Sequence, residues 1–406
     1  MRNRYLIPAI KEISFPLHKM TFISGPRQCG KTTLAKIILK SRKNGNYNNW
    51  DNLEFRKVWT KTPSQTIKLN SKTVPVIILD EIHKAKMWKR TLKGIYDCLT
   101  NPADIIVTGS AKLNVYKKGS DSLLGRYYHF RLHPFTLSEI QDNEPIKPEN
   151  LVAAISSKSL KVRRNSINNT KTLLKYGGFP EPFLMQNERQ ANLWRRGRVE
   201  KVIREDLRDI SRIPELSQIE MLTSLIPERV GSFLSRATLR ETLEVSFDTI
   251  KRWLNYLTEL YYIFEIKPYT NSIARTIKKE GKIYLWDYSE VKNESNKFEN
   301  MIANHLLKFC HFWTDTGYGV FELYCLRNKN KEEIDFLICK DGKPWLPIEA
   351  KLNDTTPSTN WKKFINQIPC NLGLQIINKP NYWKCHEYGK KKIIVLSAAD
   401  ALGYFV

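Results

Sequence analysis

The chain has 406 residues, of which 66 are Lys or Arg and 41 are Asp or Glu, so its formal charge is +25. A composition of 41% hydrophobic and 26% charged residues supports a sizeable core and excludes disordered, collagen-like and disulfide-scaffold proteins. This length predicts about two to four domains. The basic surplus favours a polyanionic partner, above all nucleic acid, although a generally lysine-rich surface is the plainer alternative.

Targeting signals and cysteines indicate the compartment. No apolar run approaches the ~18–20 residues of a membrane span. The N-terminus has no long apolar stretch and no cleavage site, so neither a signal peptide nor a membrane partner is expected. The seven cysteines are scattered and contain no C-x-x-C pair. They predict reduced thiols in the cytoplasm and no zinc site.

The first ~140 residues alternate short apolar runs with helical patterns, which is the order of βαβ units. Strands are predicted at residues 20–24, 74–80 and 104–109, with a helix over 31–40. Near-continuous apolar strands between helices indicate a parallel sheet. Residues 141–170 are polar and predict a linker or an insertion.

The middle of the chain, from about residue 171 to 268, has a helical pattern. A short helix at 237–243 is followed by a turn, a longer helix that Ser246 can cap, and a strand at 261–266. Helix, turn, helix and strand is the order of a winged helix. Four residues lie on one side of the second helix, as DNA contact would require: Thr249, Lys251, Arg252 and Tyr256.

Two alternatives stay open for this middle region. Winged helices also serve as plain packing modules. The basic stretch over residues 195–212 is interleaved with acidic residues, so it is either a salt-bridged helix face or a track for phosphates.

The last ~125 residues predict a second α/β unit. A helix at 298–309 precedes strands at 321–326, 334–338 and 345–350, and the last two are joined by a hairpin turn at Lys340-Asp-Gly-Lys. The predicted fold class is therefore α/β. The expected domains are a P-loop AAA+-like core (1–140), a linker and helical lid (141–215), a winged helix (216–270) and a C-terminal α/β domain (271–406).

The strongest motif is a phosphate loop. Residues 25–32 fit G-x-x-x-x-G-K-[ST] directly after a predicted strand and directly before a predicted helix. In such a loop, backbone N–H groups surround the β- and γ-phosphates, Lys31 supplies a cation, and the Thr32 hydroxyl ligates Mg²⁺. The motif predicts ATP or GTP binding by Gly25, Pro26, Arg27, Gln28, Cys29, Gly30, Lys31, Thr32 and Thr33.

Three further positions complete the predicted nucleotide site. An apolar strand ends in Asp80 and Glu81, the Walker B arrangement, in which Asp80 holds Mg²⁺ through water and Glu81 orients the attacking water. Ser110, at the end of the third strand, can sense the γ-phosphate. Arg126 can act as an arginine finger, in its own subunit or toward a neighbour in a homo-oligomer.

These motifs, taken in order, resemble those of the AAA-type ATPases of prokaryotes that carry a C-terminal domain of unknown function. The resemblance implies an AAA+-like core, an arginine finger at Arg126 and a winged helix after the core. Two positions depart from the family's pattern: Cys29 stands where a small apolar residue is usual, and Ala111 stands where a second Ser is common. The resemblance rests on Gly-Pro-Arg-Gln-Cys-Gly-Lys-Thr-Thr-Leu, Leu79-Asp-Glu-Ile-His-Lys, Thr108-Gly-Ser, Leu124-Gly-Arg126-Tyr, Leu132-His-Pro-Phe with Glu139, Tyr176-Gly-Gly-Phe-Pro-Glu, and Asp206 with Asp209-Ile.

Charged residues on two C-terminal strands form a second candidate site. Asp335 lies on one strand, while Glu349 and Lys351 share one face of the next. This set resembles the motif of the PD-(D/E)XK nuclease fold. In it Asp335 and Glu349 would bind Mg²⁺, Lys351 would assist cleavage of a phosphodiester, and Glu299 is a possible further ligand.

Two functions follow from these motifs. The first is an ATP-hydrolysing ATPase that acts on DNA and carries a nuclease-like C-terminal domain. The second is a non-cleaving, ATP-dependent switch or scaffold whose C-terminal domain binds DNA or a protein. Glu81 and Arg126 favour hydrolysis.

Overall fold

A computed structural model describes residues 4–42, 44–67, 73–109, 123–159, 165–207, 216–270 and 279–406. The chain divides into two compact units, Met1–His133 and Pro134–Val406. Within the described ranges, no helix is both long enough and apolar enough to cross a membrane.

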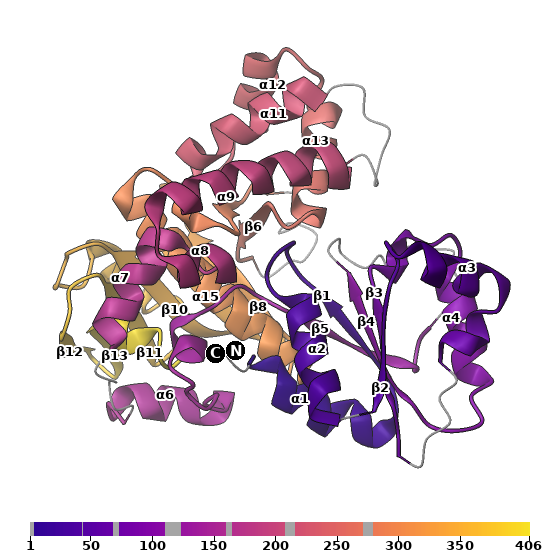
Figure 1. Ribbon diagram of the computed structural model, residues 1–406. Helices are drawn as coiled ribbons and strands as arrows, with labels where there is room; N and C mark the ends of the chain where they lie inside the picture. The colour runs from indigo at the N-terminus through magenta and orange to yellow at the C-terminus, as the bar shows by residue number, and fades with distance from the viewer. Residues whose placement is uncertain are drawn as a thin grey trace. The chain divides into compact units, whose positions relative to one another are not determined.

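The first unit is built on a five-stranded parallel sheet with the order β2-β3-β4-β1-β5 (Figure 1). Strands β1, β3 and β4 are buried along their whole length, as their near-continuous apolar runs predicted. Phosphate-loop ATPase cores have this kind of parallel α/β sheet. The strands are β1 (Met20–Ser24), β2 (Gly45–Asn49), β3 (Val76–Asp80), β4 (Asp104–Gly109) and β5 (Tyr127–Arg131).

Helices cover both faces of this sheet. The face that carries Phe22 and Leu79 packs against aromatic side chains of α3 and α4, including Trp59 and Trp88, while α1 and α2 lie on the other side of the sheet in Figure 1. The helices are α1 (Leu6–Ile13), α2 (Lys31–Arg42), α3 (Leu53–Lys61) and α4 (Trp88–Asp97), with short 3₁₀ turns at Phe15–Leu17, Pro63–Thr66 and Ile82–Lys84.

The second unit begins with helices, including a stretch that the sequence led us to expect as a linker. Within residues 141–170, α6 (Pro148–Ser156) forms because Pro148 starts it and Leu151 and Ile155 bury one face. The remaining helices of this part are α5 (Leu137–Ile140), α7 (Ser166–Tyr176), α8 (Pro180–Met185), α9 (Glu188–Lys201) followed by a π-helical turn (Val202–Asp206), α11 (Leu216–Leu225) followed by a 3₁₀ turn (Ile226–Arg229), α12 (Arg236–Leu243) and α13 (Phe247–Glu259).

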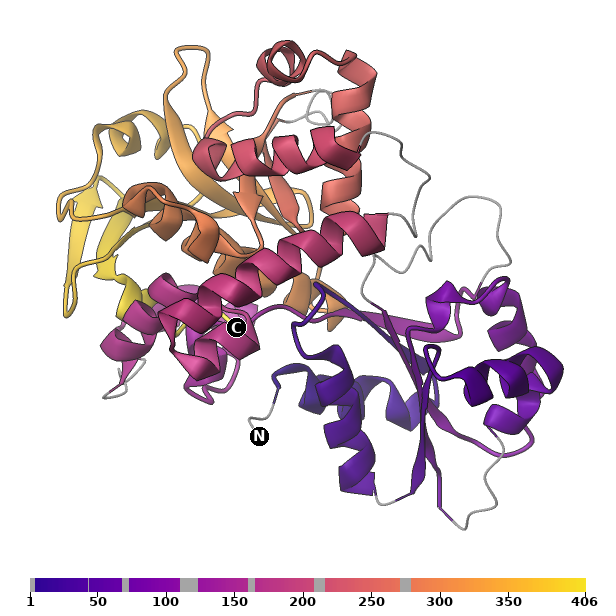
Figure 2. The same ribbon diagram turned by 45° about the horizontal axis from the view of Figure 1, so that its top comes forward.

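The core of the second unit is an eight-stranded mixed sheet with the order β12-β13-β11-β10-β9-β8-β6-β7, coloured orange to yellow for most of its strands in Figure 2. The long helix α15 (Glu294–Asp315) packs against β8 and β10. The strands are β6 (Ile263–Pro268), β7 (Lys282–Leu285), β8 (Phe321–Arg327), β9 (Glu333–Lys340), β10 (Lys343–Lys351), β11 (Leu372–Ile377), β12 (Trp383–Tyr388) and β13 (Lys391–Ser397). The remaining short helices are Tyr288–Glu290, α16 (Thr359–Phe364) and α17 (Ala398–Ala401).

Two features of this sheet matter for the candidate site. The predicted hairpin is present, because Asp341 and Gly342 both adopt positive φ (51° and 75°) in the turn between β9 and β10. The strand predicted to end the winged helix, β6, pairs in parallel with β8 and antiparallel with β7. It therefore belongs to the same sheet as the C-terminal strands.

Candidate functional site

The phosphate loop leaves the buried end of β1 and enters α2. Its first residue, Gly25, has a φ of +153°, and a Cβ there would lie 2.2 Å from the carbonyl oxygen of Leu132. Gly30 has a φ of +98°, and Gln28 between them also adopts positive φ, at 64°. A loop in this conformation turns its backbone N–H groups inward, which is what phosphate binding requires.

Lys31 lies folded over the loop that precedes it. Its buried ammonium donates hydrogen bonds to the carbonyl oxygens of Gly25, at 2.9 Å, and Pro26, at 2.7 Å. The other predicted nucleotide-binding side chains differ in exposure: Cys29 is buried, Arg27 and Thr32 are half-buried, and Gln28 and Thr33 are exposed. Cys29 is accommodated because only its backbone needs to face phosphate.

Asp80 is the polar centre of this site. The carboxylate is only 2% exposed and accepts hydrogen bonds from three hydroxyls: Thr32 at 2.8 Å, Tyr47 at 2.7 Å, and Thr108. Burial, followed by the hydrogen bond to Asp80, raises the pKa of Tyr47 to about 12, so this phenol stays a donor. The Thr32 hydroxyl and the Asp80 carboxylate supply the hard oxygen ligands that Mg²⁺ prefers, so these residues fit the predicted ion.

Glu81 follows Asp80 in a strained conformation. Its φ is 56°, and its backbone N–H donates to the carbonyl oxygen of Thr108 at 3.0 Å. The Glu81 carboxylate lies 3.6 Å from Nε2 of His83 and is 19% exposed. Non-glycine residues held at positive φ gather at functional sites, and here the residue directly after Asp80 is held in this way.

Arg126 lies far from this site within its own unit. It immediately precedes β5, whose first residue pairs with the first residue of β1, whereas the phosphate loop follows the last residue of β1. Arg126 and the phosphate loop therefore lie at opposite ends of the neighbouring strands β1 and β5, about 15 Å apart at the ~3.3 Å rise per residue of a strand. The Arg126 guanidinium instead makes a bidentate pair with Asp97, at 2.6 and 2.9 Å. In this arrangement Arg126 does not reach the phosphate loop of its own unit, and its role as an arginine finger stays a prediction. The predicted sensor Ser110 lies outside the described residues.

Sequence reasoning missed a buried arginine that braces the phosphate loop. Arg4 is 4% exposed and donates to the carbonyl oxygens of Cys29, at 2.6 Å, and His133, at 2.5 Å. The neighbouring Tyr5 hydroxyl donates to the Arg131 carbonyl at 2.8 Å. No local pattern signals this role, because the contact between Arg4 and His133 spans 129 residues.

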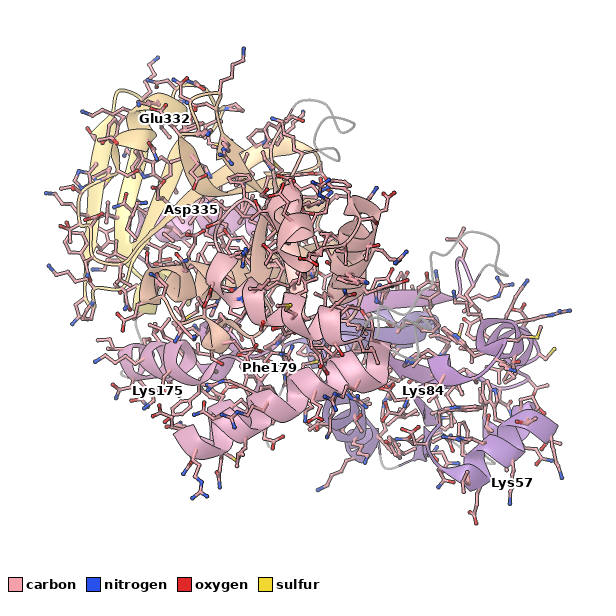
Figure 3. The ribbon with its side chains drawn as sticks, turned by 90° about the horizontal axis from the view of Figure 1, so that it is seen from above. Lys57, Lys84, Lys175, Phe179, Glu332 and Asp335 are labelled. Carbon is pink, nitrogen blue, oxygen red and sulfur yellow. The ribbon has the colours of Figure 1, made fainter. Side chains whose placement is uncertain are left out.

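The C-terminal charged residues do come together. The pairing of Ile348 with Phe336 sets Asp335 beside Glu349, and the Ala350 N–H donates to Oδ2 of Asp335 at 3.0 Å. Oε1 of Glu349 lies 2.8 Å from the Lys351 ammonium. Figure 3 labels Asp335 within this sheet.

The predicted further residue, Glu299, also lies in this cluster, and three residues that were not predicted complete it. Glu299 lies on α15 and Glu333 on β9. Lys282 and Tyr284 are on β7, and Tyr284 donates to Oε1 of Glu299 at 2.6 Å. Burial, followed by the nearby Asp335 carboxylate, raises the pKa of Glu299 and of Glu349 to about 7.

The predicted metal role of Asp335 does not fit this arrangement, whereas Glu349 keeps one buried carboxylate oxygen, Oε2, that has no hydrogen-bond partner among the described residues. Oδ1 of Asp335 contacts Lys282 at 3.0 Å and Oδ2 is held by the Ala350 N–H. Across the described ranges, no set of three or more His, Cys, Asp or Glu side chains has the arrangement of a metal site. Both carboxylate oxygens of Asp335 and Oε1 of Glu349 are therefore engaged by cations and donors of the chain itself.

The helices α12 and α13 follow each other across a short turn and are in contact. Ser235 and Ser246 cap them by accepting from the N–H groups of Thr238 and Thr249, and the cap at Ser246 confirms the predicted helix start. Lys251 and Arg252 are exposed on α13, whereas Thr249 and Tyr256 are half-buried.

The described part of the basic stretch over residues 195–212 is largely paired. Arg198 is buried against Glu290, and Arg204 pairs with Glu220 and Glu200. Arg195 donates to the Ser289 hydroxyl. For Arg198 and Arg204 the salt-bridged helix face is therefore the better of the two interpretations.

Comparison with known proteins agrees with the phosphate-loop geometry. Residues 17–141 match an AAA domain family, residues 167–292 a domain of unknown function (DUF8612), and residues 294–384 another domain of unknown function (DUF4143). Two uncharacterized proteins, from Mycobacterium bovis and Mycobacterium tuberculosis, are each 24% identical over 354 residues, covering 84% of this chain and 72% of the relative.

Solved structures with some similarity include a Walker-type ATPase of Pyrococcus abyssi, with a TM-score of 0.39, 14% identity and coverage of 73% of this chain and 98% of that one. AMPPCP-bound DnaA from Aquifex aeolicus has a TM-score of 0.28 and 13% identity, covering 59% and 81%. The loop geometry and the match over residues 17–141 lead to one conclusion: the N-terminal part of the chain is a P-loop, AAA-type ATPase domain.

Proposed function

We propose that this protein hydrolyses ATP in a magnesium-dependent reaction at the phosphate loop. One observation carries the proposal: Thr32, which follows the phosphate loop after β1, is hydrogen-bonded to Asp80, the last residue of β3, and the strained Glu81 comes next in the chain. In this mechanism Lys31 binds the γ-phosphate. Thr32 and Asp80 would hold Mg²⁺, which neutralises charge developing on the phosphate oxygens.

Glu81 supplies the step that distinguishes hydrolysis from binding alone. Its carboxylate accepts a hydrogen bond from the attacking water and orients that water toward the γ-phosphate. Asp80 is less suited to this task, because three hydroxyls already donate to its buried carboxylate. The rival function, an ATP-dependent switch, requires no such base.

Substitution of Glu81 tests the proposal. Glu81→Gln should bind ATP normally and lower kcat at least ~100-fold, as expected when the water-orienting base is lost. Lys31→Ala should lose ATP binding, and Glu54→Gln, at the exposed start of α3, is the matched control. Wild-type hydrolysis by Glu81→Gln would favour the switch instead.

We further propose that DNA is the macromolecular partner and that α13 contacts it. Support comes from the exposed Lys251 and Arg252 on the second helix of the predicted winged helix, and from the formal charge of +25. Replacing both residues by Ala should weaken DNA binding and reduce the dependence of log Kd on log salt by about two units. The control replaces Lys57 and Lys61 on α3, where Lys57 is labelled in Figure 3; an equal loss in the control would refute a specific role for α13.

For the C-terminal domain, the two possible roles were DNA cleavage and binding. We assign it binding, with a nuclease-like arrangement of Asp335, Glu349 and Lys351 and no cleavage step, because both oxygens of Asp335 and one oxygen of Glu349 are engaged within the chain. Incubation of the full chain with DNA, ATP and Mn²⁺ tests this, and cleavage that is lost in Asp335→Asn would contradict it.

A further inference from the structure

The centre of the C-terminal carboxylate cluster is occupied by the ammonium group of Lys282. Its Nζ lies 2.9 Å from Oε1 of Glu333, 3.0 Å from Oδ1 of Asp335 and 3.3 Å from Oε1 of Glu299. An ammonium has three N–H donors and no acceptor, so three carboxylate oxygens satisfy it completely. The side chain is 1% exposed, so water does not compete for these donors.

The backbone around Lys282 brings the ammonium into the cluster. Lys282 begins β7 and pairs with Ile266 on β6. At the preceding Gly281, a Cβ would lie 2.6 Å from the carbonyl oxygen of Ile266, so only glycine permits this approach. Tyr284, two residues further along β7 and on the same face, donates to Glu299. One strand therefore supplies two donors to the cluster.

The charges explain why this lysine stays protonated. Burial by itself lowers the pKa of an ammonium, but the surrounding carboxylates, Asp335 first, raise the pKa of Lys282 above its ordinary value. A divalent ion bound to the same oxygens would be held within a few ångströms of a fixed positive charge. The two cations are therefore mutually exclusive at this position.

We propose that Lys282 is the permanent cation of this cluster and takes the place of a divalent metal. The ammonium neutralises and orients Asp335, Glu299 and Glu333, and it fixes β7 to α15 and β9. In this role the cluster is a structural element of the binding domain. Lys282 lies in the segment that matches the first domain of unknown function, whereas its three partners lie in the second.

A different role for Lys282, as a lysine that assists DNA cleavage beside a bound metal, makes the opposite prediction. It requires the wild-type chain to bind a metal ion through Asp335. The two roles are therefore separated by measuring metal binding directly.

The experiment is a titration of the nucleotide-free, full-length chain with Mn²⁺, with free Mn²⁺ measured by electron paramagnetic resonance. We expect wild type and Asp335→Asn to bind the same amount of Mn²⁺. Lys282→Met should bind one additional ion per chain, which Lys282→Met combined with Asp335→Asn loses again. Lys340→Met, which removes a lysine at the end of the same β9 strand, should behave as wild type.

Thermal unfolding provides the second measurement. Because Lys282→Met leaves three carboxylates without their cation, its Tm should fall and should be raised again by Mn²⁺, whereas wild-type Tm should not respond. If Lys282→Met does not fold, the amounts of Mn²⁺ bound by wild type and by Asp335→Asn still distinguish the two roles of Lys282. Mn²⁺ binding by wild type that is lost in Asp335→Asn would overturn the proposal.

Discussion

Replacement of Arg4 by Met tests whether this buried guanidinium stabilises the phosphate loop. Met keeps much of the apolar volume but removes both hydrogen bonds, to the carbonyl oxygens of Cys29 and His133. A hydrogen bond from a charged group contributes about 1.5–3 kcal/mol. Two of them predict a loss of about 3–6 kcal/mol in the free energy of unfolding of the N-terminal unit.

A matched control separates this effect from the loss of an arginine in general. Arg42 forms one ion pair with Asp104, at 3.0 Å, and its side chain is 40% exposed. The Asp104 carboxylate is 1% exposed and keeps its contact with His18, at 3.4 Å, when Arg42 is replaced, so Arg42→Met should lower stability by less than Arg4→Met. Arg4→Lys should not restore wild-type behaviour, because a single ammonium lacks the planar fork that reaches both carbonyls.

The assays are urea unfolding followed by tryptophan fluorescence and ATP affinity measured by calorimetry. Arg4→Met should lower the urea midpoint of the first transition. It should also weaken ATP binding by about tenfold for each 1.4 kcal/mol spent on reordering the loop. If Arg4→Met and Arg42→Met have the same midpoint and the same affinity, Arg4 does not brace the loop.

Three further changes probe the two candidate sites. Tyr47→Phe removes one of the donors to Asp80, at a cost of about 1 kcal/mol, and should raise the Mg²⁺ concentration needed for half-maximal ATPase activity. Arg126→Ala should bind ATP normally but hydrolyse it slowly. If Arg126 acts on a neighbouring subunit, the specific ATPase activity of wild type should rise with protein concentration. A constant specific activity would leave Arg126 only as the partner of Asp97. Because the pKa of Glu349 is raised to about 7, the folded state binds more protons than the unfolded one between pH 4.5 and 7. Stability should therefore fall as pH rises through this interval, and Glu349→Gln should reduce the dependence measured by urea unfolding, to which Glu299 also contributes.

Much of the nucleotide site could be predicted because its signals are local. The apolar runs of β1, β3 and β4 are buried on both faces, and the phosphate loop is contiguous in sequence. Period-2 alternation also placed Glu349 and Lys351 together, and the Asp341-Gly342 turn set the pairing that brings Asp335 close to them.

What could not be predicted depends on contacts between distant segments. Lys282 reaches Asp335 across 53 residues and Arg4 reaches His133 across 129. A lone lysine at the start of a short strand and a lone arginine near the N-terminus carry no pattern that indicates burial. Arg126 lies at the opposite end of β1 from the phosphate loop because β5 pairs with β1 in parallel, and the motif Leu-Gly-Arg does not encode this pairing.

The membership of β6 and β7 in the eight-stranded sheet bears on how this protein can be divided for experiments. The matched family segments meet at residues 292 and 294, yet the sheet continues across that boundary through Lys267–Tyr324 and Pro268–Cys325 pairs. A fragment starting at residue 294 would expose the hydrogen-bonding groups of β8 as a new open edge, which promotes aggregation. Fragments of the second unit should therefore begin before α11. If a shorter fragment is insoluble, the cause would be the exposed edge of β8 and not an inactive domain.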